Sequence, residues 1–285
     1  MPAQLIDGKE IAKKIRSRLI EEIHEFKQGD KAPHLHAVQV GSNPGSDVYI
    51  RAQKRACENV GIEYTLHQLD TETTHEQAAQ FITQLNDNPA VTGLILQMPV
   101  PAQLDAHALQ CLIDPHKDAE GISPTNLGMV VYGSAPIAPC TAMAIMELIQ
   151  STGVELYGKE AVMVGHSDIV GKPTALLLLD KFVTTSVCHI ATGQRGTLEQ
   201  FVRGAEILIA AVGKANLIKG EWIKENAIVI DVGINRVQGG IVGDVEFEEA
   251  RNRAGWITPV PGGVGPVTTA MLLRNIVEAA KLQNK

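Results

Sequence analysis

Hydrophobic and polar positions follow two different periods along this chain. Over 9–27, apolar residues recur every three to four positions with charged residues between them, which predicts an amphipathic helix. Shorter segments such as 91–97 (VTGLILQ) are almost continuously apolar, which predicts strands buried on both faces. Strands are predicted at 34–41, 63–69, 91–97, 161–165, 184–190, 206–212, 227–232 and 256–259. Helices are predicted at 9–27, 47–60, 74–85, 103–112, 142–151, 175–179, 246–253 and 267–282.

Strands and helices therefore alternate along most of the chain. Such alternation is typical of βαβ units, whose strands lie parallel in one sheet. The rhythm occurs twice, with a break near 138–158, and a length of 285 residues corresponds to about two domains. The predicted fold class is α/β, with two α/β domains.

The composition narrows the class of protein. Hydrophobic residues make up 45% of the chain and aromatic residues 4%, so the predicted cores are sizeable and aliphatic. A formal net charge of −7 argues against binding to nucleic acid or to an anionic membrane. No apolar run approaches the ~18 residues of a membrane span, and the charged N-terminal segment is unlike a signal peptide. The scattered cysteines form no C-x-x-C pair and predict reduced thiols without a metal site, so we expect a cytoplasmic globular protein.

The segment 160–179 (EAVMVGHSDIVGKPTALLLL) combines a strand, a glycine turn and the start of a helix. This arrangement can direct backbone N–H groups and a helix N-terminus at a phosphate. The turn is an imperfect dinucleotide fingerprint, because Ser167 occupies the third position of G-x-G-x-x-G, where a glycine is required. An ordinary strand-to-helix connection and a nucleotide site are equally consistent with this spacing.

Four other places carry residues suited to chemistry. Tyr49 and Gln53 are four residues apart on one predicted helix and therefore share a face. Gln97 ends a buried strand, where parallel sheets expose ligand-binding residues. The loop 117–121 (KDAEG) holds three charges beside a glycine, and 261–266 (PGGVGP) presents backbone with few side chains. Taken singly, each is more often an interface aromatic, a strand end, a solvated turn or a tight connection, but their places near strand ends favour a site.

Seven stretches in one order give the chain a family resemblance. They are 46–62 (SDVYIRAQKRACENVGI), 93–101 (GLILQMPVP), 114–128 (DPHKDAEGISPTNLG), 138–141 (APCT), 164–173 (VGHSDIVGKP), 210–235 (AAVGKANLIKGEWIKENAIVIDVGIN) and 258–273 (TPVPGGVGPVTTAMLL). With them the chain resembles the bifunctional methylenetetrahydrofolate dehydrogenase/methenyltetrahydrofolate cyclohydrolase family from end to end. The PGGVGP motif is the most specific of these matches.

The resemblance implies two α/β domains around a cleft. Residues 1–140 and 268–285 would form a folate-binding catalytic domain, and 141–267 a Rossmann-type domain for NADP or NAD. The implied activity is oxidation of 5,10-methylenetetrahydrofolate to 5,10-methenyltetrahydrofolate by hydride transfer, followed by hydrolysis to 10-formyltetrahydrofolate. The implied partners are tetrahydrofolate derivatives and a second copy of the chain in a homodimer.

The resemblance also assigns site residues. The catalytic positions are Tyr49, Gln53, Gln97 and Glu120. The substrate positions are Tyr49, Gln97, Glu120, Pro261, Gly262 and Gly263, with Val264 beside them. The cofactor positions are Gly165, His166, Ser167, Ile190, Gly213 and Ile234.

Two departures from the family pattern concern the folate chemistry. Gln53 stands where the family has a lysine, and an amide cannot take up a proton near neutral pH. Lys54 is rotated about 100° from Gln53 around a helix and should face elsewhere. Glu120 replaces an aspartate and is one methylene longer. We therefore predict dehydrogenase activity with weak or absent cyclohydrolase activity; the alternative is a folate- and nucleotide-binding paralogue without catalysis.

The third departure concerns the cofactor. His166 replaces an arginine expected at the NADP 2′-phosphate, and Ile190 replaces a nearby serine. A phosphate favours a permanent, bidentate cation, so the preference for NADP is predicted to be weakened. No acidic residue ends the strand 184–190 to hold an NAD ribose, and Arg195 is a cation that could serve NADP instead.

Overall fold

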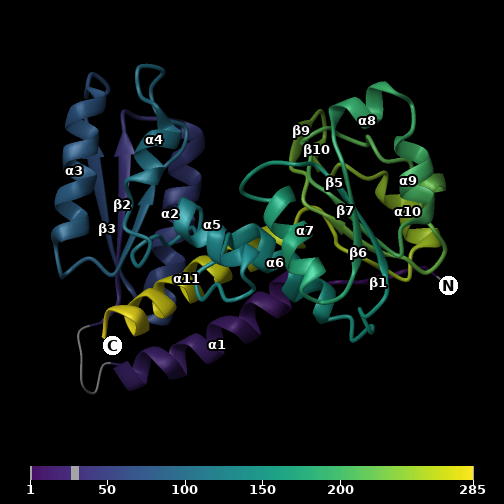
Figure 1. Cartoon of the computed structure of the whole chain (residues 1–285), viewed down its shortest axis with the longest axis horizontal. Coiled ribbons are helices and arrows are strands. Elements are labelled where there is room, and N and C mark those ends of the chain that lie inside the picture. The colour runs from purple at the N-terminus through teal and green to yellow at the C-terminus, as the bar shows by residue number, and fades with distance from the viewer. Residues whose placement is uncertain (1, 27–31, 285) are drawn as a thin grey trace. The chain divides into compact units, whose positions relative to one another are not determined.

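We describe the protein from a computed structural model, which covers residues 2–26 and 32–284. The chain divides into two compact units (Figure 1). Unit 1 contains Met1–Lys13 and Thr141–Thr268, and unit 2 contains Lys14–Cys140 and Thr269–Lys285. The change from unit 2 to unit 1 after Cys140 lies within the break expected at 138–158. Lys27, the predicted end of the first helix, lies outside the described residues.

The N-terminal segment belongs to unit 1, although the sequence analysis placed 1–140 in one folate-binding domain. Strand β1 (Gln4–Leu5) pairs in parallel with β11 (Trp256–Ile257). The N–H of Ile6 continues this pairing by donating to the Ile257 carbonyl at 2.9 Å. A two-residue strand carries almost no periodic signal, so the hydrophobic pattern does not reveal this pairing.

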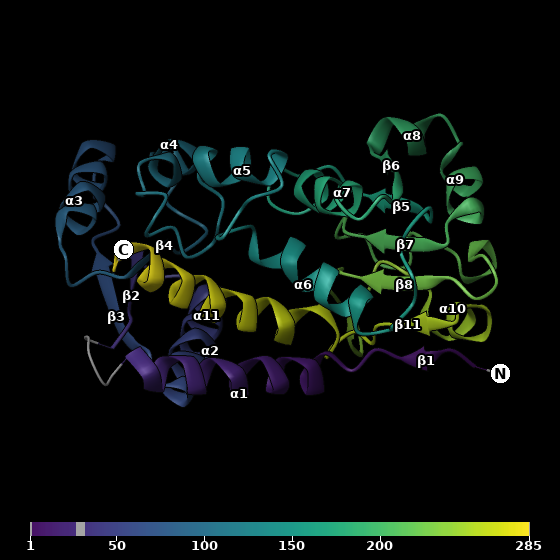
Figure 2. The ribbon, with the colours of Figure 1, turned by 60° about the horizontal axis from the view of Figure 1, so that its bottom comes forward.

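Unit 1 is built on a parallel sheet with the strand order β1-β11-β8-β7-β5-β6 (Figure 2). Its other strands are β5 (Glu160–Val164), β6 (Thr184–Cys188), β7 (Ile207–Ala210) and β8 (Ile228–Asp231). From β5 the chain passes to β6 on one side and then to β7 on the other side of β5. A reversal of this kind opens a crevice at the carboxyl ends of the central strands, where α/β sheets bind ligands.

Helices flank this sheet and bury its apolar strands. They are α6 (Cys140–Gln150), α7 (Gly171–Leu179), α8 (Ile190–Gln194), α9 (Leu198–Gly204) and α10 (Phe247–Arg253), with a 3-10 turn η1 (Gly220–Trp222) and an antiparallel hairpin of β9 (Asn235–Val237) and β10 (Gly240–Val242). Leu208 of β7 packs with Val162 of β5 and Val229 of β8 in the core. All four residues of β7 are buried, as the continuous apolar run predicts for a strand covered on both faces.

Unit 2 holds a smaller parallel sheet in the order β3-β2-β4. Its strands are β2 (His34–Val40), β3 (Glu63–Leu69) and β4 (Gly93–Leu96), and its helices are α2 (Pro44–Val60), α3 (His75–Asp87), α4 (Ala106–Cys111), α5 (Pro124–Val131) and most of α1 (Gly8–Phe26) and α11 (Val264–Gln283). Figure 1 shows α3 and α2 on opposite sides of the strands. Val38, Leu94 and Ile82 belong to the core beneath α3, and Ile276 of α11 packs against Gly93 on the other face.

Several element boundaries differ from the prediction, and three of the differences lie beside predicted site residues. Ile190, expected to end a strand, begins helix α8, because β6 stops at Cys188. Helix α5 (Pro124–Val131) lies inside the expected polar loop, where Ser123 caps its N-terminus. Helix α11 begins at Val264, inside the expected glycine-rich loop. At α5 the cap by Ser123 fixed the start of the helix, where the apolar period was weak.

The structure also bears on the expectations for membrane spans and for the cysteines. Within residues 2–26 and 32–284, no helix is long and apolar enough to cross a membrane. The cysteines Cys57, Cys111, Cys140 and Cys188 are all free, and only Cys111 is exposed.

Candidate functional site

Two of the predicted folate residues of unit 2, Gln53 and Gln97, meet where β4 ends beside α2. Gln97 directly follows β4, is 5% exposed, and donates from Nε2 to Gln53 Oε1 at 2.8 Å. Tyr49 lies one helical turn before Gln53, and its side chain is 59% exposed. The four-residue spacing thus places the exposed phenol of Tyr49 and the partly buried amide of Gln53 on one face of α2, as the sequence predicted.

Two polar contacts, which the sequence analysis did not predict, hold the start of α2 against the segments that contain Gln39 and Met98. The Ser46 hydroxyl donates to the Met98 carbonyl at 3.1 Å, and Gln39 Nε2 donates to Asp47 Oδ1 at 3.4 Å. Ser46 lies in a stretch rich in turn residues, which hid its role as an anchor of the helix start. Lys54 pairs with Glu58 at 3.9 Å, and both side chains are more than half exposed. Lys54 therefore faces another direction than the Gln53–Gln97 pair.

Two of the three charged residues in the loop 117–121 have structural roles: Lys117 binds the end of α3, and Asp118 binds backbone of its own loop. The Lys117 ammonium donates to the carbonyls of Asn86 at 2.5 Å and Asn88 at 2.8 Å, at the C-terminal end of α3. Asp118 is buried and accepts from the N–H of Gly121 at 2.9 Å and of Ser123 at 2.7 Å. Lys117 and Asp118 are therefore not candidates for catalysis. Glu120 is the one charged residue of KDAEG that remains a candidate.

Glu120 is a carboxyl group with an unusual proton affinity. Burial, and second the charge of Asp118, raise the pKa of Glu120 to about 8. The group is therefore mostly protonated at neutral pH and can donate as well as accept a hydrogen bond. The sequence alone could not reveal this, because the pKa depends on the surroundings that folding creates.

A buried amide from the last helix fixes the position of Glu120. Asn275 Nδ2 donates to the carbonyls of Ala119 at 3.0 Å and Ala138 at 2.9 Å. The Cys140 N–H donates to the Glu120 carbonyl at 3.2 Å. Asn275 is fully buried in the helical stretch MLLRNIVEAA, where Arg274 and Glu278 are also polar, so the sequence pattern alone does not single it out.

Four of the six predicted cofactor residues of unit 1 line a cavity of about 660 Å³ at the carboxyl ends of β5, β6 and β7. Gly165, His166 and Ser167 contribute from the turn after β5, and His189 and Ile190 from the segment after β6. The cavity therefore lies at the reversal of strand order, where the fold predicts a ligand. Its volume is within the ~300–1,000 Å³ typical of small-molecule sites.

Glycine allows the tight turn at this cavity. Gly165 has φ +125°, and a Cβ there would lie 2.4 Å from the Ala211 carbonyl oxygen. A Cβ at Gly171 would lie 2.2 Å from the Gly165 carbonyl oxygen. Ser167, which departs from the fingerprint, accepts at Oγ from the Gly171 N–H at 3.4 Å, at the start of α7. Both glycines are thus required by chain packing.

Basic side chains are the ionisable groups of this cavity. The rings of His166 and His189 lie 5.4 Å apart between centroids, and Lys214 lines the cavity from the segment after β7. The sequence analysis did not single out His189 or Lys214. Arg195, considered there as a second cation, ends α8 and is not among the described residues that line the cavity.

The remaining predicted cofactor positions differ in whether they line this cavity. Gly213 lies between cavity residues Val212 and Lys214 and has φ +67°. Ile234 is 56% exposed and does not belong to the described lining of the cavity. Ile190, by contrast, is 76% exposed and does line it. Exposed apolar side chains of this kind are candidates for contact with a flat ligand surface.

The glycine-rich loop 261–266 has both exposed residues and residues packed against other backbone segments. Gly262 has φ +111°, and its nearest neighbour for an added Cβ is the Lys9 side chain at 3.4 Å. Gly263 is buried, and a Cβ there would lie 2.7 Å from the Pro259 carbonyl oxygen, while a Cβ on Gly8 would lie 1.8 Å from the Gly263 carbonyl oxygen. Pro261 is exposed. Pro261 and Gly262 therefore stay candidates for ligand contact, whereas Gly263 is required by the close approach of two backbone segments within unit 1.

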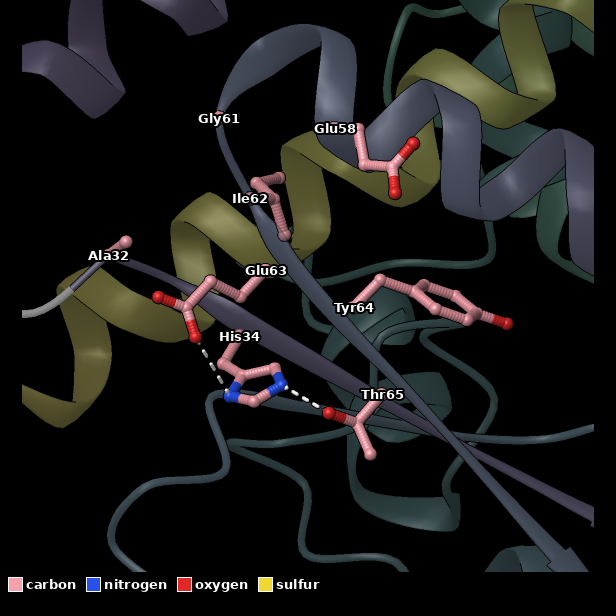
Figure 3. Close-up of a pocket in the computed structure, with 8 residues that line it drawn as sticks. All are labelled: Ala32, His34, Glu58, Gly61, Ile62, Glu63, Tyr64 and Thr65. Carbon is pink, nitrogen blue, oxygen red and sulfur yellow. Dashed lines mark hydrogen bonds and ion pairs between the residues drawn. The ribbon is translucent and has the colours of Figure 1, made fainter.

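A second cavity, of about 440 Å³, lies in unit 2 at the amino ends of β2 and β3 (Figure 3). His34 stands in it between two partners: its Nδ1 is 3.5 Å from Glu63 Oε2, and its Nε2 is 2.8 Å from Thr65 Oγ1. The cavity holds no predicted site residue and lies at the opposite strand ends from Gln97. In the part of the chain that the structure describes, no group of three or more His, Cys, Asp and Glu could hold a metal ion.

Comparison with known proteins covers both units. Residues 6–120 match the tetrahydrofolate dehydrogenase/cyclohydrolase catalytic domain, and residues 139–284 match the NAD(P)-binding domain of the same family. A bifunctional protein FolD of Moorella thermoacetica is 48% identical over 282 residues, which are 99% of this chain and 100% of that protein.

Solved structures agree with these matches. FolD from Campylobacter jejuni is 39% identical, with a TM-score of 0.95 over 98% of this chain and 99% of that one. FolD from Trypanosoma brucei, solved with NADP and an inhibitor, is 37% identical, with a TM-score of 0.93 over 100% and 99% of the two chains. The two-domain α/β fold with an NAD(P)-binding domain and the two family matches together identify the chain as a member of the tetrahydrofolate dehydrogenase/cyclohydrolase family.

Proposed function

We propose that this protein oxidises 5,10-methylenetetrahydrofolate to 5,10-methenyltetrahydrofolate by hydride transfer to NAD(P). The observation that carries the proposal is the family match over both units, combined with a cavity at the strand reversal of the NAD(P)-binding domain. FolD from Campylobacter jejuni is a bifunctional methylenetetrahydrofolate dehydrogenase/cyclohydrolase, which favours an enzyme over the catalytically inactive paralogue.

The residues around the cavity of unit 1 fit a dinucleotide. The close-packed turn at Gly165 brings backbone near the cavity, and His166, His189 and Lys214 offer hydrogen-bond donors to phosphate oxygens. Exposed Ile190 offers an apolar surface for a base. When bound, the nicotinamide supplies the hydride acceptor, and the protein supplies binding and orientation.

The residues at the end of β4 and on α2 fit the folate substrate. Gln97, held by Gln53, presents a fixed amide, and Tyr49 presents an exposed ring and hydroxyl. Glu120, protonated at neutral pH, can donate a hydrogen bond to the pterin or accept one from it. Hydride transfer removes no proton, so holding the methylene carbon in the reactive orientation is the main task of these side chains.

A nicotinamide-absorbance assay with methylenetetrahydrofolate tests the proposed function. We expect reduction of at least one of NAD and NADP that depends on enzyme concentration. Absence of reduction with both cofactors at high enzyme concentration, in a preparation that binds folate, would support the inactive paralogue instead.

Cofactor choice gives a sharper prediction. His166→Arg is expected to raise kcat/KM with NADP by about tenfold or more, because a permanent fork-shaped cation binds a phosphate better than an imidazole does. The value with NAD is expected to stay within about threefold, since NAD carries no 2′-phosphate. The measurement is kcat/KM for both cofactors in wild type and variant.

Arg195→Ala is the matched control for this prediction, because it removes a nearby cation that is not among the described residues lining the cavity. We expect it to leave the NADP/NAD ratio unchanged. A strong NADP preference in the wild-type protein would contradict the prediction and would direct attention to Lys214, a permanent cation in the cavity.

The assembly and the location of the protein are also part of the proposal. We propose a homodimer in the cytoplasm, based on the family resemblance and on four cysteines that are all free thiols. Sedimentation equilibrium at micromolar concentration tests the dimer.

A further inference from the structure

A fully buried carboxylate lies directly beneath the cavity of unit 1. Asp244 has no exposed surface. Its Oδ2 accepts from the N–H groups of Val212 at 2.7 Å and Gly213 at 3.0 Å. Its Oδ1 accepts from the N–H of Lys214 at 2.8 Å and from Asn235 Nδ2 at 2.9 Å. All four donors are neutral, so a buried charge is held by oriented N–H groups instead of a cation.

Three of these donors are consecutive backbone groups of one segment. The segment 212–214 follows β7, and Val212 and Lys214 line the cavity. Successive N–H groups that converge in this way form a concavity for an anion. Because the Asp244 carboxylate fills that concavity, the segment offers the cavity its side chains in place of these N–H groups.

A second buried carboxylate holds Asp244 itself. Asp231, at the end of β8, accepts from the N–H of Asp244 at 2.9 Å and of Val245 at 2.9 Å. The two carboxylates leave no room for neighbouring side chains. A Cβ at Gly233 would lie 2.3 Å from Asp244 Oδ1, and one at Gly243 would lie 1.9 Å from Asp231 Oδ2. The spacing of glycine and aspartate in 231–235 (DVGIN) and 242–245 (VGDV) is thus explained by packing of the two carboxylates.

We propose that Asp244 is a positioning residue of the nucleotide site, which holds segment 212–214 in the conformation that the cofactor binds. The inference rests on the proposed function of unit 1 as an NAD(P) site. It goes further by assigning a role in cofactor affinity to a side chain that is buried beneath the cavity lining. Its rival is a role in folding alone, through the Asn235 contact to the hairpin.

Replacement of Asp244 by asparagine separates these roles. In Asp244→Asn one carboxylate oxygen becomes an NH₂ group, which must face two N–H donors whichever way the amide turns. At least one of the backbone N–H groups of segment 212–214 then loses its hydrogen bond. We expect the Kd for NADP and NAD to rise on the order of tenfold to a hundredfold, with the KM for methylenetetrahydrofolate changed less than about threefold at saturating cofactor. Cofactor titration followed by nucleotide fluorescence measures Kd.

Two further variants complete the experiment. Asn235→Ala removes the hairpin contact and leaves the three backbone donors in place, so its Kd should stay within about threefold of wild type. Gly213→Ala strains the segment directly at φ +67° with the carboxylate intact, and should weaken cofactor binding as Asp244→Asn does.

Each outcome bears on the inference. Wild-type cofactor affinity in either Asp244→Asn or Gly213→Ala overturns it. Equal losses in Asn235→Ala and Asp244→Asn also overturn it, in favour of folding alone. If Asp244→Asn does not fold, Gly213→Ala decides the matter by the same titration. Failure of the wild-type protein to bind either cofactor is a different result, which overturns the proposed function together with this inference.

Discussion

Gln53→Lys is expected to raise the enzyme-dependent hydrolysis of methenyltetrahydrofolate by about 10²-fold or more, the usual contribution of a positioned acid–base group. Hydrolysis needs water to attack, a proton to leave that water, and a proton to reach the departing ring nitrogen. A glutamine amide can hydrogen-bond but cannot carry a proton between these positions near neutral pH. The wild-type protein should therefore release methenyltetrahydrofolate as its main product.

The structure supports this substitution at this position. Gln53 accepts from Gln97 at 2.8 Å, so the residue already contacts another candidate site residue. A lysine there would donate to the Gln97 carbonyl oxygen after that amide turns over, and the partly buried position would lower the lysine pKa toward the range of a proton relay. Dehydrogenase activity should change less, because hydride transfer needs no relay.

Lys54→Gln is the matched control, because Lys54 is the adjacent lysine and pairs with Glu58 on an exposed part of α2. We expect it to change neither activity. The measurement is loss of methenyl absorbance above the spontaneous background for wild type and both variants. Rapid hydrolysis by wild type that Gln53→Lys leaves unchanged would show that another group carries the proton. Glu120, with a pKa of about 8, would be the next group to replace.

The apolar period predicted the parallel strands well because burial on both faces leaves an uninterrupted run, as in β7 (Ile207–Ala210). The helix predicted at 74–85 also began at the N-cap residue of α3, Thr74, and the structure shows that Gln77 completes a capping box. Boundaries without a strong period, such as the start of α8 at Ile190, were not predictable from it. Strand β1 was missed because its two residues depend on a partner far along the sequence.

The candidate site was predictable to the extent that it follows strand ends and helix spacing. Gln97 follows the end of a strand, Gln53 shares a helix face with Tyr49, and the two glutamines are hydrogen-bonded to each other. The buried polar groups that hold the site, Lys117, Asp244 and Asn275, were not predicted as such, because a charged or amide residue in sequence looks the same in a solvated turn and in a buried network. Only the fold shows which donors surround it, and thus which polar residues position others.

Three histidines in unit 2 form a further polar cluster inside a sheet face. His36 Nδ1 lies 2.8 Å from His67 Nε2, and the His34 and His36 rings are 4.1 Å apart between centroids. Phe81 of α3 covers His67 edge-on. Burial first, then the charges of His34, His67 and Lys117, lower the pKa of His36 to about 4. His36 Nε2 is buried and has no hydrogen-bond partner among the described groups, so a proton there would gain no acceptor.

The cluster predicts loss of stability in mild acid. Because the pKa of His36 is about 4 in the folded protein and about 6.5 in the unfolded chain, the unfolded chain binds more protons between these values. The free energy of unfolding should therefore fall as pH decreases from 6.5, by about 2 kcal/mol at pH 5 and about 3 kcal/mol at pH 4 from His36 alone, at 1.36 kcal/mol per pKa unit. Urea unfolding of His36→Gln at pH 8 and pH 5 should show a pH dependence smaller by about 2 kcal/mol, whereas exposed His107→Gln should behave as wild type. An unchanged pH dependence in His36→Gln would show that His36 takes up its proton as readily in the folded protein as in the unfolded chain.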